Sequence, residues 1–485
     1  MANAPALVSK VWNYAHVLRD QGVSFGDYLE QITFLLFLKM DQERDSLLGE
    51  GSAIPADCRW STLAALDGEA LTVHYRDVLD KLGKEVGLIG TLFRGAQNKL
   101  TDPAKLTRVV SLIDKETWLG LDVDTKGEIY EGLLERHAGE VKSGAGQYFT
   151  PRALIDACVE VMKPKLGETV HDPACGTGGF LLSAFEHMKG DLKAADRSTL
   201  RQLREHTFSG VDIVADVTRL CAMNLYLRGL GNGESPVETR DALSRSEGPY
   251  DVILTNPPFG KKSSYKVIGD DGGVKTETDS YERDDFAYTT SNKQLNFMQH
   301  IMSTLKVGGR AAVVLPDNVL FEAGQAGEGL RRRLLDRFNF HTLLRLPTGI
   351  FYKPGVKANV LFFDRGPPSE ATATKALWIY DFRTNTHFTL KQNPLKRADL
   401  DDFVAAYSAG DFNARQDSER FRPFVYDDLI NRDKLNLDIF WLKDDGLEDT
   451  DSLPSPDIIA AEIVDNLEAA LDMFREVAGE LEPDG

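Results

Sequence analysis

The feature that most constrains the fold is an alternation of short apolar runs and helical segments between residues 150 and 364. Strands that alternate with helices pair in parallel and need helices on both faces of the sheet. The pattern therefore predicts an α/β fold with a mostly parallel sheet, and late strands near Gly355 would add an antiparallel edge. The expected strands are 169–172, 207–212, 250–254, 310–315, 342–346 and 359–364.

The segments on either side of this region differ from it in character. Residues from Val8 to about Lys142 show helical spacing, with a break at 49–55 and a helix start at Asp102-Pro103. After Arg365 the sequence is polar and irregular, and a final helix with a single apolar face is expected over 456–481.

Length and composition limit the class of protein. With 485 residues, of which 42% are hydrophobic, the chain should form two or three domains with well-buried cores. It has neither a signal-peptide pattern nor an apolar run near the roughly 20 residues that span a bilayer. We expect a cytoplasmic protein without metal, disulfides or zinc, because the scattered cysteines read as small buried apolar residues. These are Cys58, Cys158, Cys175 and Cys221.

The formal net charge of −19 restricts the possible partners. Contacts to phosphate groups supply most of the affinity for DNA, and an acidic surface opposes them. Either the chain does not bind nucleic acid, or a separate basic partner brings nucleic acid to it.

The stretch Asn256-Pro257-Pro258-Phe259 follows the apolar run 252–254. Two prolines stop a strand abruptly and leave Asn256 at its carboxyl end, where open α/β sheets bind ligands. The side-chain oxygen of Asn256 and the carbonyl of Pro257 would accept both protons of an exocyclic amine. Phe259 would stack on the ring that carries this amine. An Asn-Pro pair alone could simply open a loop, but the full stretch indicates transfer onto an aromatic amine.

A glycine-rich turn follows the first strand and opens a helix. Glycines allow close approach of a ligand, and a helix amino terminus presents free N–H groups to it. The dinucleotide fingerprint requires glycine where Leu181 stands, so a ligand with a positive centre, such as S-adenosylmethionine, fits better. The candidate binding residues here are Asp172, Ala174, Gly176, Thr177, Gly178 and Gly179.

Further candidates for the cofactor site lie on both sides of this turn. Asp212, at the end of the second strand, would accept bonds from ribose hydroxyls, although a helix cap is an alternative. Asp241 would accept a bond from the adenine amine of the cofactor, or act only as a turn residue. Capping alone explains Thr150-Pro151, whereas Gln147 and Phe149 would line the methionine side. The candidates before the first core helix are Gln147, Tyr148, Phe149, Thr150, Pro151 and Arg152.

These segments, in this order, resemble the modification subunits of type I restriction–modification systems, which are adenine-N6 DNA methyltransferases. The resembling stretches are 146–152, 172–180, 256–260, 291–321 and 343–364. The resemblance implies S-adenosylmethionine as the cofactor and a flipped-out adenine of double-stranded DNA as the substrate. It also implies that two such subunits assemble with a specificity subunit that reads the DNA, at times with a motor-nuclease restriction subunit.

The resemblance divides the chain into four expected parts. A helical domain, 1–142, would dock a partner or DNA, and a Rossmann-like S-adenosylmethionine-dependent methyltransferase domain would cover 143–370. An irregular extension, 371–455, would follow, and then an amphipathic helix, 456–485, for subunit docking, with folding back on its own domain as the alternative. A stand-alone methyltransferase acting on RNA or protein glutamine is an alternative, as is a non-catalytic scaffold, although intact Asp172, Asp212 and Asn256 argue against the scaffold.

Two basic stretches remain. The polar loop 261–292 would close over DNA or simply be solvated. The run Arg331-Arg332-Arg333 is expected to form one solvated face of a helix.

Overall fold

The computed structural model describes residues 25–49, 51–118, 150–190, 196–231, 234–260, 264–268, 274–278, 280–351, 356–390, 393–408, 411–442, 460 and 464. The chain divides into two compact units. Unit 1 comprises Met1–Gly146, Cys175–Leu182 and Gly190–Asp241, and unit 2 comprises Gln147–Ala174, Ser183–Lys189 and Ala242–Gly485.

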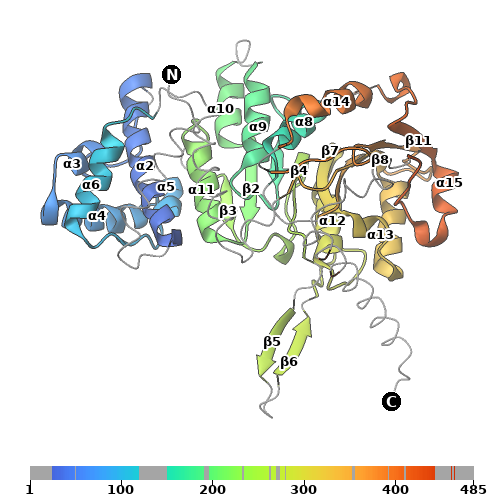
Figure 1. Cartoon of the computed structure of the whole chain (residues 1–485), viewed down its shortest axis with the longest axis horizontal. Helices are drawn as coiled ribbons and strands as arrows, with labels where there is room; N and C mark the ends of the chain where they lie inside the picture. Colours follow the sequence, from blue (N-terminus) through green and yellow to red (C-terminus); the bar gives the residue numbers. More distant parts are fainter. Residues whose placement is uncertain are drawn as a thin grey trace. The chain divides into compact units, whose positions relative to one another are not determined.

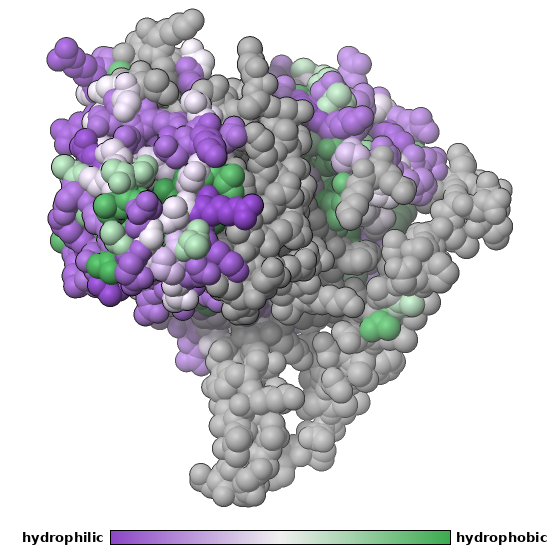
Figure 2. Space-filling model, turned by 60° about the vertical axis from the view of Figure 1, so that its left-hand side comes forward, coloured by the Kyte–Doolittle hydropathy of each residue, from purple (hydrophilic) through white to green (hydrophobic). Residues whose placement is uncertain are grey.

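Unit 1 begins with helices, as the spacing predicts (Figure 1). They are α2 (Phe25–Leu48), η2 (Ala56–Cys58), α3 (Trp60–Ala64), α4 (Gly68–Gly83), α5 (Gly87–Phe93) and α6 (Pro103–Asp114). The predicted start at Asp102-Pro103 is confirmed, because the Asp102 carboxylate accepts bonds from the backbone N–H groups of Ala104 and Lys105. The rings of Phe34 and Phe93 stack in the core, with their centroids 5.2 Å apart. On the face shown in Figure 2 the described residues are mainly hydrophilic, with small hydrophobic patches.

Unit 1 also contains a parallel strand pair. Its further elements are α10 (Arg197–Glu205), β2 (Phe208–Asp212), α11 (Ala215–Tyr226) and β3 (Val237–Thr239). In the register of β2 and β3, Gly210 lies beside Val237 and Asp212 lies beside Thr239. The carboxyl ends of both strands therefore reach the same edge.

Unit 2 is built on a mixed sheet. Its strands, in spatial order, are β11 (Phe421–Val425), β10 (Ala376–Asp381), β8 (Asn339–Arg345), β9 (Ala358–Asp364), β7 (Leu305–Pro316), β4 (Tyr250–Thr255) and β1 (Val170–Asp172). β1, β4 and β7 are parallel, and so are β8 and β10. β9 runs antiparallel between β7 and β8, and β11 antiparallel to β10. The predicted α/β fold is confirmed.

Helices cover the sheet of unit 2 and bury its apolar side chains. They are α8 (Arg152–Met162), α12 (Lys293–Thr304), α13 (Gly324–Arg337), α14 (Asp401–Tyr407) and α15 (Tyr426–Ile430), with short turns η4 (Ala242–Ser244), η5 (Asp317–Leu320), η6 (Arg397–Leu400), η7 (Phe412–Ala414) and η8 (Asp433–Leu435). α9 (Gly179–Met188) follows the glycine-rich turn. All four cysteines are free and buried, as predicted. None of the described helices is both long and apolar enough to cross a membrane.

Three expectations about the late chain were wrong. The segment after Arg365 is not irregular, because β10 and β11 extend the sheet and α14 and α15 pack nearby. The expected antiparallel pairing of two late strands is present between β8 and β9, but β9 lies inside the sheet and the antiparallel edge strand is β11. The loop 261–292 contains a separate hairpin, β5 (Ser264–Ile268) and β6 (Val274–Thr278). Gly355 and most of the expected terminal helix lie outside the described residues.

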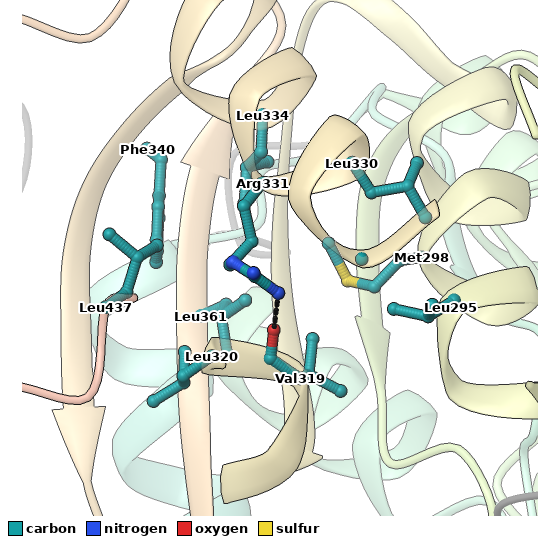
Figure 3. Close-up of a pocket in the computed structure, with 11 residues that line it drawn as sticks. Leu295, Met298, Val319, Leu320, Leu330, Arg331, Leu334, Phe340, Leu361 and Leu437 are labelled. Carbon is teal, nitrogen blue, oxygen red and sulfur yellow. Dashed lines mark hydrogen bonds between the residues drawn. The ribbon is translucent and has the colours of Figure 1, made fainter. Parts of the chain in front are cut away.

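Arg331 corrects a fourth expectation, since only its neighbours Arg332 and Arg333 are exposed. The Arg331 side chain is 3% exposed and donates to the Val319 carbonyl at 3.2 Å (Figure 3). It also donates to the carbonyls of Leu435 and Lys434, at 3.0 and 2.8 Å. Burial lowers its pKa to about 10. These bonds fasten the turn η8 to α13 and η5.

A small cavity lies beside Arg331 (Figure 3). Its volume is about 20 Å³, and its lining is mostly apolar, including Leu295, Met298 and Leu330. That volume holds about one water molecule, so this cavity is not a site for a cofactor.

We predict that Arg331→Met lowers the free energy of unfolding by about 3 kcal/mol, because three carbonyls, two of them in buried hydrogen bonds, lose their donor. Arg333→Met, on the exposed side of the same helix, should change it by less than about 0.5 kcal/mol. Urea denaturation of both variants measures the difference. Equal losses would contradict the structural role of the buried guanidinium.

Candidate functional site

The side chain of Asn256, directly after β4, is buried and hydrogen-bonded. The two prolines after it lack N–H donors, so the strand cannot continue. Asn256 is 7% exposed, and its Nδ2 donates to Thr150 Oγ1 at 2.8 Å, across 106 residues of sequence. Because oxygen and nitrogen lie on opposite sides of an amide, this bond turns Oδ1 away from Thr150.

The same bond changes the interpretation of Thr150. Capping was expected to explain Thr150-Pro151, but α8 begins at Arg152 with Pro151 as its N-cap, and no side chain caps it. The Thr150 hydroxyl instead accepts from Asn256. Arg152 pairs with Asp156 one helical turn away, at 3.1 Å. Gln147, Tyr148 and Phe149 lie outside the described residues.

Two aromatic rings meet beyond the ends of β4 and β8. The centroids of Phe259 and Phe351 are 5.8 Å apart, with an angle of 73° between the planes. Phe259 is half-buried, and Phe351 is 2% exposed. Sequence reasoning did not select Phe351, although it lies within a resembling stretch, because nothing in the sequence pairs it with Phe259.

The glycine-rich turn leaves β1 and leads into α9. Asp172, the last residue of β1, is buried and accepts a bond from the backbone N–H of Ala174 at 3.0 Å. Gly176 and Gly178 have φ values of +53° and +89°, which L side chains adopt only with strain. A Cβ on Gly176 would meet no atom within 4 Å, so the turn is open there. A Cβ on Gly178 would lie 2.8 Å from Cys221 Sγ.

Asp212 joins the turn to the end of β2. Its Oδ2 accepts from the N–H of Gly176 at 3.1 Å and its Oδ1 from that of Val214 at 2.9 Å. Burial raises the pKa of the Asp212 carboxyl, and these two backbone donors oppose the shift. Ile213, next in the chain, is 69% exposed. An exposed apolar side chain beside a half-buried carboxylate suits a ligand with both a polar and a flat apolar part.

The other predicted residues of unit 1 lie near these groups in the chain. Thr177 is half-buried, and Gly179 is the first residue of α9. Asp241 lies two residues beyond Thr239, the register partner of Asp212, at the same edge of the strand pair. The backbone N–H of Arg240 donates to the Asp212 carbonyl at 3.0 Å. The structure thus brings Gly176 and Asp212 together in unit 1, and Thr150 and Asn256 together in unit 2.

One cluster of unit 2 has the composition of a metal site. The Nε2 atoms of His171 and His300 lie 3.1 and 3.2 Å from Glu247 Oε1. Arg283 Nη1 lies 3.0 Å from His300 Nδ1. Because arginine can only donate, His300 Nδ1 must accept, and its Nε2 then carries the proton. The cluster is therefore built as a hydrogen-bonded network around Glu247.

Comparison with known proteins places these groups in a family context. The sequence matches the N-6 DNA Methylase family over residues 121–442 and the HsdM N-terminal domain over residues 7–113. It is 38% identical to the methylase subunit of the type I restriction enzyme StySPI of Salmonella potsdam, over 96% of this chain and 93% of that protein. Identity to the EcoKI methylase subunit of Escherichia coli K12 is also 38%, with the same coverage.

Solved structures give the same result. The EcoKI M protein matches with a TM-score of 0.54 and 33% identity, over 99% of this chain and 96% of that one. A chain from a study of complex assembly and conformational transition in the type I R-M system matches with a TM-score of 0.69 and 27% identity, over 100% of both chains.

We predict that Gly178→Ala lowers the free energy of unfolding by about 3 kcal/mol, since it adds backbone strain and a clash with Cys221. Gly176→Ala has open space for its Cβ and should cost only about 1 kcal/mol. Adding Cys221→Ala to Gly178→Ala should recover part of the loss. Chemical denaturation tests the series, and equal effects of the two glycine variants would contradict the packing at Gly178.

Proposed function

Since this chain belongs to the family of type I restriction enzyme methylase subunits, we propose that it transfers a methyl group from S-adenosylmethionine to adenine N6 in DNA. The observation that supports this most directly is the oriented amide of Asn256 beside the Pro257 carbonyl. Two acceptors at a strand end match an amine with two protons.

The amine of adenine is a weak nucleophile, because its lone pair is delocalised into the ring. Acceptance of both N–H protons by Asn256 Oδ1 and the Pro257 carbonyl would draw the nitrogen towards a tetrahedral geometry. With its nitrogen donating to the Thr150 hydroxyl, Asn256 would present Oδ1 to the adenine amine. No base with a shifted pKa is required before attack, so positioning would supply most of the rate.

The target base must leave the duplex to reach this corner. Phe259 would stack on it, and Phe351, packed edge-on against Phe259, would hold that ring in place or form a second wall. Both aromatic residues follow strands whose carboxyl ends face the same edge of the sheet.

The groups around the glycine turn fit S-adenosylmethionine. When bound, it supplies an electrophilic methyl group on a sulfonium centre. Asp212 would accept ribose hydroxyls, and the exposed Ile213 would cover an apolar face of the adenine. The open side of the turn at Gly176 would receive the charged methionine part. Asp172 and residues 147–152 remain predicted ligands of the same cofactor. Asp241 would accept a bond from the cofactor's adenine amine.

We further propose that the chain works in a type I restriction–modification complex with a specificity subunit, two methyltransferase subunits and at times a restriction subunit. A net charge of −19 supports this division of labour, since a basic partner would then carry the affinity for DNA. The sequence preference would lie in that partner.

We predict that Asn256→Ala lowers kcat for DNA methylation by at least about 10²-fold and leaves S-adenosylmethionine binding intact. Thr150→Val keeps the shape but loses the acceptor, and should cost about tenfold. Thr304→Val is the matched control, because that buried hydroxyl bonds only within its own helix. Transfer of labelled methyl groups and calorimetric cofactor binding give the two readouts. Joint loss of binding and transfer in Asn256→Ala would count against these roles.

We also predict that the purified chain alone binds duplex DNA with a Kd of about 10⁻⁵ M or weaker at physiological salt. Copurification with a basic partner should produce tight, sequence-specific binding. A filter or fluorescence titration distinguishes the two states, and tight specific binding by the isolated chain would refute the partner argument.

A further inference from the structure

Helix α11 contacts the glycine-rich turn through two side chains on one face. Asn224 Nδ2 donates to the carbonyl of Thr177 at 3.1 Å, and Cys221 Sγ fills the space beside Gly178. The two residues are three positions apart, so they lie on the same side of the helix. The turn is therefore held by Asp212 at Gly176 and by Asn224 at Thr177.

The burial of Asn224 is costly for the fold. The residue is 1% exposed, on a helix whose other buried residues are mostly apolar. Its Oδ1 is buried without a hydrogen-bond partner among the described residues. A leucine would fill the same space without burying an unsatisfied carbonyl oxygen. The hydrogen bond from the Asn224 amide to the Thr177 carbonyl is the favourable interaction that offsets this cost.

A different face of α11 is fastened to the amino-terminal helices. Arg44 donates to the Tyr226 carbonyl and hydroxyl at 3.1 and 2.7 Å, and that hydroxyl donates to Asp41 Oδ1 at 2.8 Å. Arg219, two turns before Tyr226, forms an ion pair with Glu30 at 2.7 Å. Both anchors of α11 therefore lie on α2.

The hydrogen-bonded cluster around Asp41 is buried and polar, and it therefore holds α11 at one position on α2. Arg44, Asp41 and Tyr226 are 4, 1 and 2% exposed. Burial raises the pKa of Asp41, and bonds from Ser52 and Tyr226 oppose that shift. A buried polar cluster of this kind tolerates little sliding, because any displacement leaves charged groups without partners. Tyr226 is only two residues from Asn224, so the cluster also fixes where Asn224 lies.

We infer that Asn224 is a positioning residue for the cofactor and that the amino-terminal helices fix it through Asp41, Arg44 and Tyr226. The helical region would then act within this chain, by holding the cofactor turn in its receiving shape, besides any docking role. The inference rests on the proposed cofactor site at the turn.

Three single variants test this. Asn224→Leu removes the donor to Thr177 and should weaken S-adenosylmethionine binding by about tenfold. Tyr226→Phe removes one hydroxyl of the cluster around Asp41 and should weaken S-adenosylmethionine binding by about threefold. Tyr75→Phe, which removes a buried hydroxyl that donates to Gln31 within the amino-terminal helices, is the matched control and should leave binding unchanged.

Hydrogen exchange supplies a readout that general destabilisation would not reproduce. Without cofactor, Asn224→Leu and Tyr226→Phe should speed exchange at the Gly178 amide, which donates to the Cys175 carbonyl, whereas Tyr75→Phe should not. The inference is overturned if Asn224→Leu binds as the parent does, or if Tyr226→Phe and Tyr75→Phe are equivalent in both assays. If the parent chain itself fails to bind S-adenosylmethionine, the proposed function fails instead.

Discussion

The bond from Asn256 to Thr150 is the constraint on which the proposed chemistry depends. An asparagine at a strand end can rotate its amide and exchange acceptor for donor with little cost in shape. In the structure the amide nitrogen donates to the Thr150 hydroxyl at 2.8 Å in a buried setting, which leaves Oδ1 as the acceptor directed away from Thr150. Thr150 directly precedes α8, and Asn256 directly follows β4, with β1 between them in the sequence. The bond therefore forms only when these two distant segments fold together. The oriented acceptor is thus a product of the tertiary fold, which local sequence alone does not create.

Much of the fold was predictable, because an alternation of apolar runs and helical segments indicates a parallel sheet that is buried on both faces. The central strands β4, β7 and β9 contain apolar runs at 252–254, 311–315 and 360–363. The bounds of β1, β4 and β9 lie close to those expected, whereas β7 begins at Leu305 instead of 310. Of the two late strands, β11 was missed because it carries no such run. β10 does carry one, Ala376–Tyr380, but it lies within a polar stretch. β11 includes Arg422 and Pro423 on exposed positions, which an edge strand tolerates and a sequence pattern reads as a loop.

The residues of the candidate site likewise divide into those that the sequence predicts and those that it does not. Asn256, the glycine turn and Asp212 could be selected because their types and spacing carry chemistry by themselves. Phe351, Ile213 and Asn224 could not, since each matters only through a neighbour that folding brings to it. Thr150 was selected, but for a capping role that the structure gives to no side chain. Arg331 was misjudged because a run of three arginines looks solvated, whereas the helix turns one of them inward.

The buried arginines bear on how an acidic chain can act on DNA. Among the described residues, Arg44, Arg331, Arg345 and Arg415 are at most 6% exposed, and three of them donate to backbone carbonyls. A guanidinium used in this way holds segments of the chain together and is not available to contact a phosphate group. The buried aspartates Asp41, Asp172 and Asp381 remove a similar amount of negative charge, so burial leaves the net charge of −19 almost unchanged. A net negative charge opposes contact with the DNA backbone, while the strand-end corner offers acceptors for one base. A chain built this way gains specificity for the amine at the expense of affinity for the duplex, and a basic subunit that holds the duplex would compensate for that loss.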